Sequence, residues 1–186
     1  MKIPRTYRIN TKRCILRCIS EQDIPYVFSA TRFEGFNDGM LWEPPQSIEE
    51  LKEPFKRSLQ AWDAGLAYTF TIESANTSAF LGRISIRKDK AQGVWNIGFW
   101  THPEHQRQGY MTEAAKAIIE FGFTVLGADR IEACHALWNT GSEKVLTRIG
   151  MKFVGYIAQG FHKHGKWVEE NLLEITKEDW KSSKKI

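Results

Sequence analysis

A single glycine stands between a strand-like segment and the longest helix-like segment of the chain. Residues 94–101 are apolar, aromatic and β-branched, which predicts a buried strand. From Met111 to Val125 the apolar residues recur at helical spacing. Gly109 would let a ligand approach the main chain at the start of this helix, where free N–H groups and the positive end of the helix dipole favour an anion. The segment therefore predicts a phosphate site, and an ordinary polar turn is the plainer alternative.

A second group of polar residues follows the strand-like segment 130–137. The helix connects this segment to residues 94–101, and two strands joined in that way are expected to pair in parallel. Ligands favour the carboxyl ends of such strands, and Asn139 and Ser142 stand there. Helix capping is their alternative use, because residues 140–143 already read as a capping box.

The composition favours one globular domain. The chain has 186 residues, of which 42% are hydrophobic and 26% are charged, enough for a substantial core. No run approaches the roughly 20 apolar residues of a membrane span, and the first residues lack the apolar stretch of an export signal. Cys14, Cys18 and Cys134 are odd in number and form no close metal-binding pairs. We therefore expect reduced thiols in a cytoplasmic protein, with no metal and no membrane partner.

The net charge does not predict a nucleic-acid partner. The formal net charge is +4, but the basic residues are scattered and several of them lie in the last six positions. A basic rim that binds phosphates is an equally good use of this charge.

Periodicity and turn residues predict a mixed α/β domain over residues 1–186, with residues 1–8 and 181–186 frayed. Three predicted strands follow one another across short polar turns, which favours an antiparallel meander. The predicted strands are 13–17, 67–74, 80–87, 94–101, 130–137, 151–158 and 167–175. The predicted helices begin near Ser20, Ser47, Met111 and Thr140.

The glycine turn also resembles a known cofactor loop. Residues 106–111 read Gln-Arg-Gln-Gly-Tyr-Met and are followed by Thr-Glu-Ala. They resemble the acetyl-CoA loop of the GNAT acyltransferases, Gln/Arg-x-x-Gly-x-Gly/Ala, except that Met111 stands where a small residue is usual. Asn139 and Ser142 match the Asn-x-x-Ser of the RimJ/RimL type, which acetylates protein N-termini. The likeness to this type extends across almost the whole chain.

The resemblance implies a GNAT fold, with a mostly antiparallel sheet of six or seven strands, one splayed parallel pair and flanking helices. It implies transfer of acetyl from acetyl-CoA to a primary amine by direct attack. We expect a monomer or a homodimer, and the sequence leaves both open. Ser142 would protonate the leaving thiolate, and Asn96 and Ser142 are the catalytic candidates. The candidates for binding acetyl-CoA are Phe99, Trp100, Thr101, Gln106, Arg107, Gln108, Gly109, Tyr110, Met111 and Asn139.

The residue expected as the general base is absent. The family often supplies it from a Glu-Ile-Gly run on the central strand, where this chain has Asn96, and an amide cannot take a proton at neutral pH. A water held by Asn96 could serve instead, as could a loop carboxylate from Glu34, Asp38 or Glu43. About a tenth of an α-amine is neutral at pH 7, against a few parts in ten thousand for an ordinary lysine. A site without a strong base therefore fits an α-amine, or another amine of low pKa, better than a lysine, and we expect the N-terminal α-amine of a protein or peptide as the acceptor.

Residues 31–45 form a long loop that is rich in glycine, proline and aromatic residues. Phe33, Trp42 and Glu43 are the candidates for contact with the acceptor, and a hydrophobic lid is the alternative role of the aromatic residues. Three histidines could transfer a proton, although anion contact, exposure or a place in the core explains them as well. They are His102, His105 and His135.

Two rival functions stay open. The acceptor could be the amine of an antibiotic, a polyamine or an amino acid. The chain could also be an acyl-CoA-binding module without catalysis, because Asn96 replaces the expected base.

Overall fold

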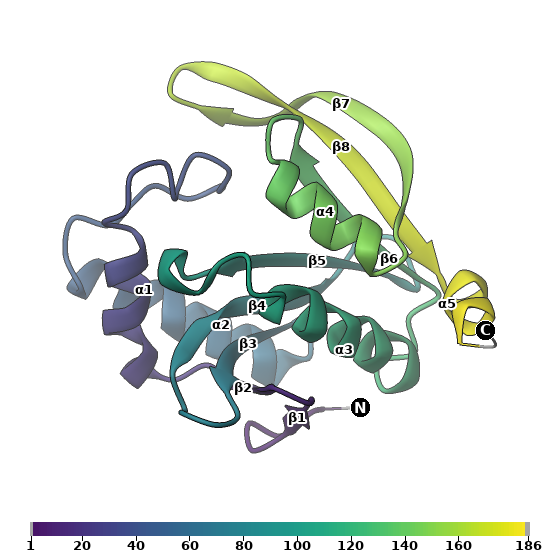
Figure 1. Ribbon diagram of the computed structural model, residues 1–186, viewed down its shortest axis with the longest axis horizontal. Helices are drawn as coiled ribbons and strands as arrows, with labels where there is room; N and C mark the ends of the chain where they lie inside the picture. The colour runs from purple at the N-terminus through teal and green to yellow at the C-terminus, as the bar shows by residue number, and fades with distance from the viewer. Residues whose placement is uncertain (1, 185–186) are drawn as a thin grey trace.

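A meander of three antiparallel strands forms the middle of the chain, as the short polar turns predicted. The computed structural model describes residues 2–184 and contains one mixed sheet of eight strands (Figure 1). The strands in spatial order are β1 (Arg8–Asn10), β2 (Cys14–Cys18), β3 (Ala67–Ser74), β4 (Phe80–Lys88), β5 (Val94–Thr101), β6 (Arg130–Ala136), β8 (Lys166–Thr176) and β7 (Lys152–Lys163). All neighbouring strands are antiparallel except β5 and β6.

The prediction of six or seven strands was therefore too low, since the sheet has eight strands. The additional strand, β1, has three residues and pairs antiparallel with β2, with Arg8 opposite Arg17. Three residues are too few to show an alternating pattern. The pairing with β2, and not the local sequence, makes this segment a strand.

The parallel pair separates after three residues. β5 and β6 are in register from Val94 opposite Arg130 to Asn96 opposite Glu132, and no pairing follows. β6 keeps its other partner, β8, along its whole length. The expected splay is confirmed, and it leaves one edge of the second half of β5 without a neighbouring strand.

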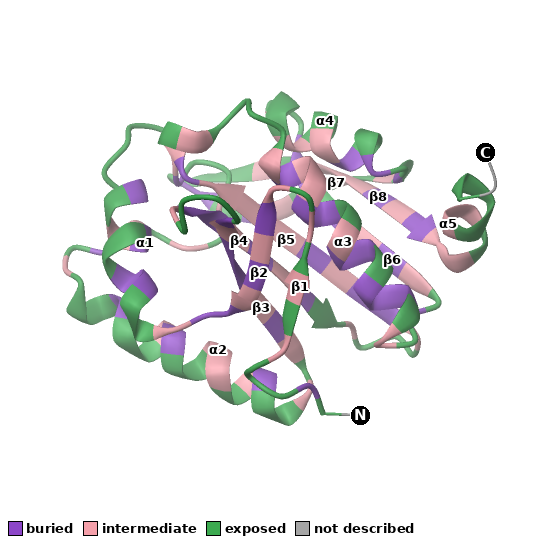
Figure 2. Cartoon of the chain, turned by 60° about the horizontal axis from the view of Figure 1, so that its bottom comes forward, coloured by how far each residue is buried: buried purple, intermediate pink, exposed green. Residues whose placement is uncertain are grey.

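Helices cover both faces of the sheet, with α3 in front of it and α2 behind it in the view of Figure 1. The α-helices are α1 (Ile24–Ala30), α2 (Lys52–Ala64), α3 (Tyr110–Thr124), α4 (Thr140–Arg148) and α5 (Lys177–Ser183). Three short 3₁₀ turns precede α1, α2 and α3, namely η1 (Glu21–Asp23), η2 (Glu49–Leu51) and η3 (Pro103–His105). Buried residues gather on the strands and on the inner side of α3 (Figure 2).

α3 packs very close to the sheet because it carries a glycine at the contact. A Cβ atom at Gly122 would lie 2.6 Å from Ile131 Cδ1 and 2.9 Å from Ile86 Cδ1. Ile118 and Phe121 of the same helix are buried in the core. The apolar face of α3 thus packs against the sheet, and this contact fixes the position of the helix relative to β4 and β6.

Two predictions about the chain ends differ from the structure. Ile3 is buried and its carbonyl accepts a hydrogen bond of 2.8 Å from Trp62 Nε1, and Arg5 pairs with Asp63. The segment expected to be frayed is thus held against α2. At the other end, residues 181–183 belong to α5, whose N-cap is Thr176. Residues 1, 185 and 186 lie outside the described residues.

The last hairpin is longer than predicted. β7 continues to Lys163, so the turn narrows to residues 164 and 165. Phe161 and Lys163 are buried in this extension. The partners of Lys163, the Trp42 carbonyl and Glu43, come from the loop after α1, which the local sequence does not reveal. Among residues 2–184, no helix has the length and apolar content needed to cross a membrane.

Candidate active site

The turn around Gly109 has the geometry of an anion-binding loop. Arg107 and Gly109 adopt left-handed backbone conformations, with φ of 61° and 79°, and α3 begins at Tyr110 directly behind them. Within residues 2–184 the amides of Arg107, Gln108 and Gly109 donate no hydrogen bond. Left-handed residues alternating with right-handed ones turn successive N–H groups to one side, which makes a concave anion site. The positive end of the α3 dipole faces the same place.

The side chains of this loop divide into two groups. Residues 106–109 are exposed, whereas Met111 is 6% exposed and belongs to the hydrophobic core. The core therefore accommodates the side chain that replaces the usual small residue. Tyr110 is half-buried and packs against the same core.

The open edge of β5 leads from this loop into the splay. Phe99, Trp100 and Thr101 pair only with β4, through Ile84, Arg83 and Gly82. In an antiparallel strand, alternate residues direct their N–H and C=O groups to opposite edges. The β6 side of this segment consequently offers unpaired main-chain groups to an extended ligand that contains amides.

Asn139 and Ser142 stand at the first turn of α4, just beyond the end of β6. Asn139 is the N-cap, and its Oδ1 accepts a hydrogen bond of 3.0 Å from the Ser142 amide. The capping role assigned to residues 140–143 thus belongs to Asn139, one position earlier. Asn139 Nδ2 stays available as a donor, and Ser142 Oγ makes no hydrogen bond with the described residues. Both side chains are half-buried.

The loop of residues 31–45 is tied to the β7–β8 hairpin by a buried lysine. The Lys163 side chain is 3% exposed, and its Nζ lies 3.1 Å from the Trp42 carbonyl oxygen and 2.9 Å from Glu43 Oε1. Phe36 of the loop packs edge-on against Trp100 of β5, with ring centroids 5.2 Å apart. Phe33 contacts the ring of His102 in the same way. The loop therefore reaches both the splay and the hairpin.

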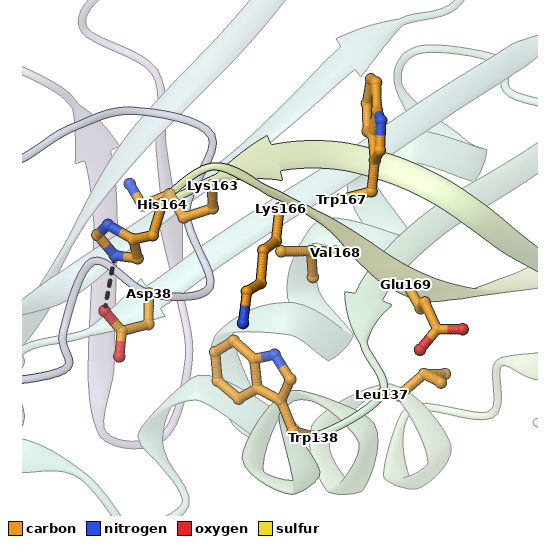
Figure 3. Close-up of a pocket in the computed structure, with 9 residues that line it drawn as sticks. All are labelled: Asp38, Leu137, Trp138, Lys163, His164, Lys166, Trp167, Val168 and Glu169. Atoms are coloured by element: carbon orange, nitrogen blue, oxygen red, sulfur yellow. Dashed lines mark ion pairs between the residues drawn. The ribbon is translucent and has the colours of Figure 1, made fainter.

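A pocket of about 380 Å³ lies between this loop, the end of β6 and the hairpin (Figure 3). Its walls carry aromatic, apolar and charged side chains. They come from Asp38, Leu137, Trp138, Lys163, His164, Lys166, Trp167, Val168 and Glu169. Of the predicted acceptor contacts, Phe33, Trp42 and Glu43 do not line this pocket, and Asp38 is the loop residue that does.

The comparisons with known proteins identify the family. The family model for the acetyltransferase (GNAT) domain matches residues 13–152. The chain belongs to the GNAT acetyltransferase family. N-acetyltransferase YnaD of Bacillus subtilis (strain 168) is 28% identical over 172 residues, 92% of this chain and 98% of that protein.

Solved structures show the same fold. An acetyltransferase of the GNAT family from Bacillus anthracis has a TM-score of 0.82 at 23% identity, covering 92% of this chain and 99% of its own. RimL, a ribosomal L7/L12 alpha-N-protein acetyltransferase solved in complex with coenzyme A, has a TM-score of 0.83 at 19% identity, covering 91% and 98%.

This GNAT chain is an acetyl-CoA-dependent N-acetyltransferase. The residues fit that donor. The free amides at 107–109 suit a diphosphate, and the unpaired edge of residues 99–101 suits the amides of a pantetheine arm. Asn139 and Ser142 lie across the splay from that edge, on the β6 side.

Asn96 lies apart from the other candidates of this GNAT site. It is the last residue of β5 that pairs with β6, and so it lies at the closed end of the splay. Its Nδ2 donates a hydrogen bond of 2.7 Å to Asp89 Oδ2. At about 3.3 Å per residue, Asn96 is roughly 13 Å along the strand from Trp100. The side-chain oxygen of Asn96 makes no hydrogen bond with the described residues.

One cluster beside the GNAT loop was missing from the sequence analysis. Glu113 of α3 accepts hydrogen bonds from Thr11 Oγ1 (2.6 Å), Arg13 N (2.7 Å) and Arg13 Nε (2.7 Å). Partial burial opposes ionisation of Glu113, but these hydrogen bonds prevail and hold its pKa below the usual range. The partners are about a hundred positions apart, so no local pattern could reveal them.

The histidines are occupied in structural contacts. His102 is buried, with Nε2 2.9 Å from Ser29 Oγ, and burial lowers its pKa, which favours the neutral ring. His135 is also buried, with Nδ1 2.9 Å from the Ala136 carbonyl oxygen. His105 packs beside His102. Within residues 2–184, no three acidic, histidine or cysteine side chains gather in a way that could hold a metal ion.

Proposed function

We propose that this GNAT enzyme transfers the acetyl group of acetyl-CoA to the α-amine at the N-terminus of a protein or peptide. The pocket beyond the end of β6 carries the proposal, because it lies between a loop and a hairpin and measures about 380 Å³. This arrangement suits the end of an extended chain. A protein or peptide can enter it only by a terminus or a loop.

On the donor side, bound acetyl-CoA supplies an acetyl group activated as a thioester. The amides from Arg107 to Met111 hold the diphosphate, and the free edge of residues 99–101 binds the pantetheine arm. Asn139 contributes its Nδ2 donor, because Oδ1 is occupied by the helix cap. Ser142 Oγ is the proton donor to the leaving thiolate, and its freedom from other hydrogen bonds supports that role.

On the acceptor side, the chain offers no strong general base among the candidate residues. Asn96 keeps its oxygen free to orient a water. Asp38 and Glu169 bring carboxylates to the pocket. An α-amine near pKa 8 needs less help than a lysine, whose deprotonation at neutral pH costs about 3.5 kcal/mol more. The lack of a strong base therefore supports an N-terminal acceptor.

One protein of the same fold supports the proposal of an N-terminal acceptor. RimL, which has the same fold at 19% identity, is an alpha-N-protein acetyltransferase of ribosomal L7/L12. A cytoplasmic location belongs to the proposal, because all three cysteines are free thiols and free thiols suit a reducing compartment.

A small cationic amine is the second candidate acceptor. Trp138 and Trp167 lie in the pocket with the carboxylates of Asp38 and Glu169. Aromatic faces and carboxylates together attract ammonium groups. A polyamine or an aminoglycoside would contact these same side chains of the pocket.

Release of free CoA thiol from acetyl-CoA over a matched panel tests the proposal. The key pair is one peptide with a free N-terminus and one internal lysine, and the same peptide with its N-terminus already acetylated. We expect the first to be acetylated at least tenfold faster. Faster reaction of the blocked peptide would contradict an N-terminal acceptor, and faster reaction of spermidine or an aminoglycoside would favour the second candidate. Tight CoA binding without turnover on any acceptor would mean a binding module.

A further inference from the structure

Arg13 connects the first hairpin of the sheet to the diphosphate loop. Its Nη1 donates a hydrogen bond of 3.0 Å to the Gln108 carbonyl oxygen. Its guanidinium lies over the Tyr110 ring, 4.7 Å from the centroid. Its Nη2 lies 3.4 Å from the position of a Cβ on Gly109. One side chain thus contacts three consecutive residues of the loop.

Glu113 holds Arg13 in that position. It accepts from both the main-chain amide and Nε of Arg13, at 2.7 Å each, while Thr11 Oγ1 donates to the same carboxylate at 2.6 Å. The Glu113 side chain is 20% exposed and the Arg13 side chain 42% exposed. A charge-assisted contact with several bonds fixes the guanidinium far better than a single exposed ion pair would.

The contact with Gln108 determines where the next amide points. The Gln108 carbonyl and the Gly109 N–H belong to one planar trans peptide, so they point in opposite directions. Because Arg13 binds the carbonyl, the Gly109 N–H is turned away from Arg13. Gly109 has φ of 79°, and a glycine adopts negative φ just as readily, so this peptide can flip at little cost. Without Arg13, the orientation of the central amide of the loop would not be fixed.

We propose that Arg13, held by Glu113, is a positioning residue that keeps the Gln108–Gly109 peptide turned toward the diphosphate of acetyl-CoA. The inference rests on the proposed binding of the diphosphate by this loop. Arg13 acts through the peptide and does not touch the acyl group. Its removal weakens nucleotide binding and leaves the chemical step unchanged.

Calorimetric binding of CoA, dephospho-CoA and pantetheine to Arg13→Gln, Arg13→Lys and Glu113→Gln tests this role without any acceptor. We expect Arg13→Gln to weaken CoA and dephospho-CoA by the same factor, about tenfold, and to leave pantetheine unchanged. Arg13→Lys keeps the charge but cannot contact Glu113, Gln108 and Tyr110 together, so it should bind as weakly as Arg13→Gln. Glu113→Gln should weaken CoA at least threefold. With a working acceptor, the KM for acetyl-CoA should rise and kcat should stay within twofold.

Arg5→Gln is the matched control, since it removes another N-terminal arginine paired with a carboxylate, Asp63, and has no contact with the loop. It should bind all three probes like the wild type. Full binding by Arg13→Lys would mean that only the charge matters, and equal weakening of pantetheine would mean a general structural defect. A penalty seen with CoA but absent with dephospho-CoA would mean direct contact with the 3′-phosphate. Each result overturns the inference. If the wild type binds CoA no better than pantetheine, the proposed diphosphate site itself fails.

Discussion

Two residues at the start of α4 each use different polar atoms for helix capping and for the proposed site. Asn139 uses Oδ1 to cap the helix and leaves Nδ2 for a ligand. Ser142 uses its main-chain amide for the cap and leaves Oγ for chemistry. Because the tasks fall on different atoms, substitutions can separate the stability of α4 from the activity of the site.

Asn139→Ser is expected to separate the two tasks of residue 139. Serine is also a good N-cap, so the melting temperature should stay within about 2 °C of the wild type. The Nδ2 donor is lost, so the KM for acetyl-CoA should rise about threefold to tenfold, as for one lost hydrogen bond of about 1 kcal/mol. Asn139→Ala should show the same raised KM for acetyl-CoA as Asn139→Ser, and its melting temperature should be lower than that of the wild type. An unchanged KM in both variants would rule out the contact with the donor.

Ser142→Ala should reduce kcat about 10- to 100-fold, because it removes a proton donor from the leaving group. Steady-state kinetics should show an unchanged KM for acetyl-CoA. Thr147→Ala, an exposed hydroxyl of the same helix that binds only the Glu143 carbonyl, is the control and should leave kcat unchanged. Full activity of Ser142→Ala would show that the hydroxyl of Ser142 has no catalytic role.

The elements are joined by buried charges as well as by the apolar core. Asp23 of η1 is 1% exposed and accepts hydrogen bonds from Arg17 of β2, Thr71 of β3 and the Ser20 amide. Burial alone would raise the pKa of Asp23, but these donors outweigh it and the pKa is lowered. The start of α1 is therefore fixed to two strands by one carboxylate.

Asp23→Asn is expected to destabilise the protein by about 3 kcal/mol, because Arg17 keeps a partly buried charge with fewer partners. A depressed native pKa adds stability that is present above the unfolded value, near 4, and lost as pH falls through the native value. The loss on going from pH 7 to pH 3 should thus be smaller in Asp23→Asn. Urea unfolding at both pH values measures this. Equal losses in both proteins would show that other carboxylates dominate.

Distant parts of the chain meet around the pocket. The loop after α1 and the hairpin of β7 and β8 are far apart in sequence and are joined by Lys163, the Trp42 carbonyl and Glu43. In Figure 1 the hairpin reaches over toward this loop. The shape of this pocket therefore depends on segments that are far apart in the sequence.

Lys163→Met is expected to loosen the loop and raise the KM for the acceptor about tenfold. The KM for acetyl-CoA should stay within twofold of the wild-type value, because the turn around Gly109 is in contact with Arg13 and not with Lys163. Lys152→Met, which removes an exposed lysine paired with Asp179 at the base of β7, is the matched control and should change neither constant. An equal rise in both KM values for Lys163→Met would argue against a local role.

Local patterns predicted most of the helices and strands and singled out the turn around Gly109. The spacing of apolar residues predicted the helix behind Gly109. Short polar turns predicted the meander of β3, β4 and β5, and the helix between β5 and β6 predicted their parallel pairing. Only the tertiary structure decided the rest. β1 is too short to show an alternating pattern, and the extension of the last hairpin is too polar to read as a strand. The Arg13–Glu113 contact and the contact of Lys163 with the Trp42 carbonyl join residues that are 100 and 121 positions apart. A single sequence contains no signal for such pairs, since each partner alone reads as an ordinary exposed polar residue.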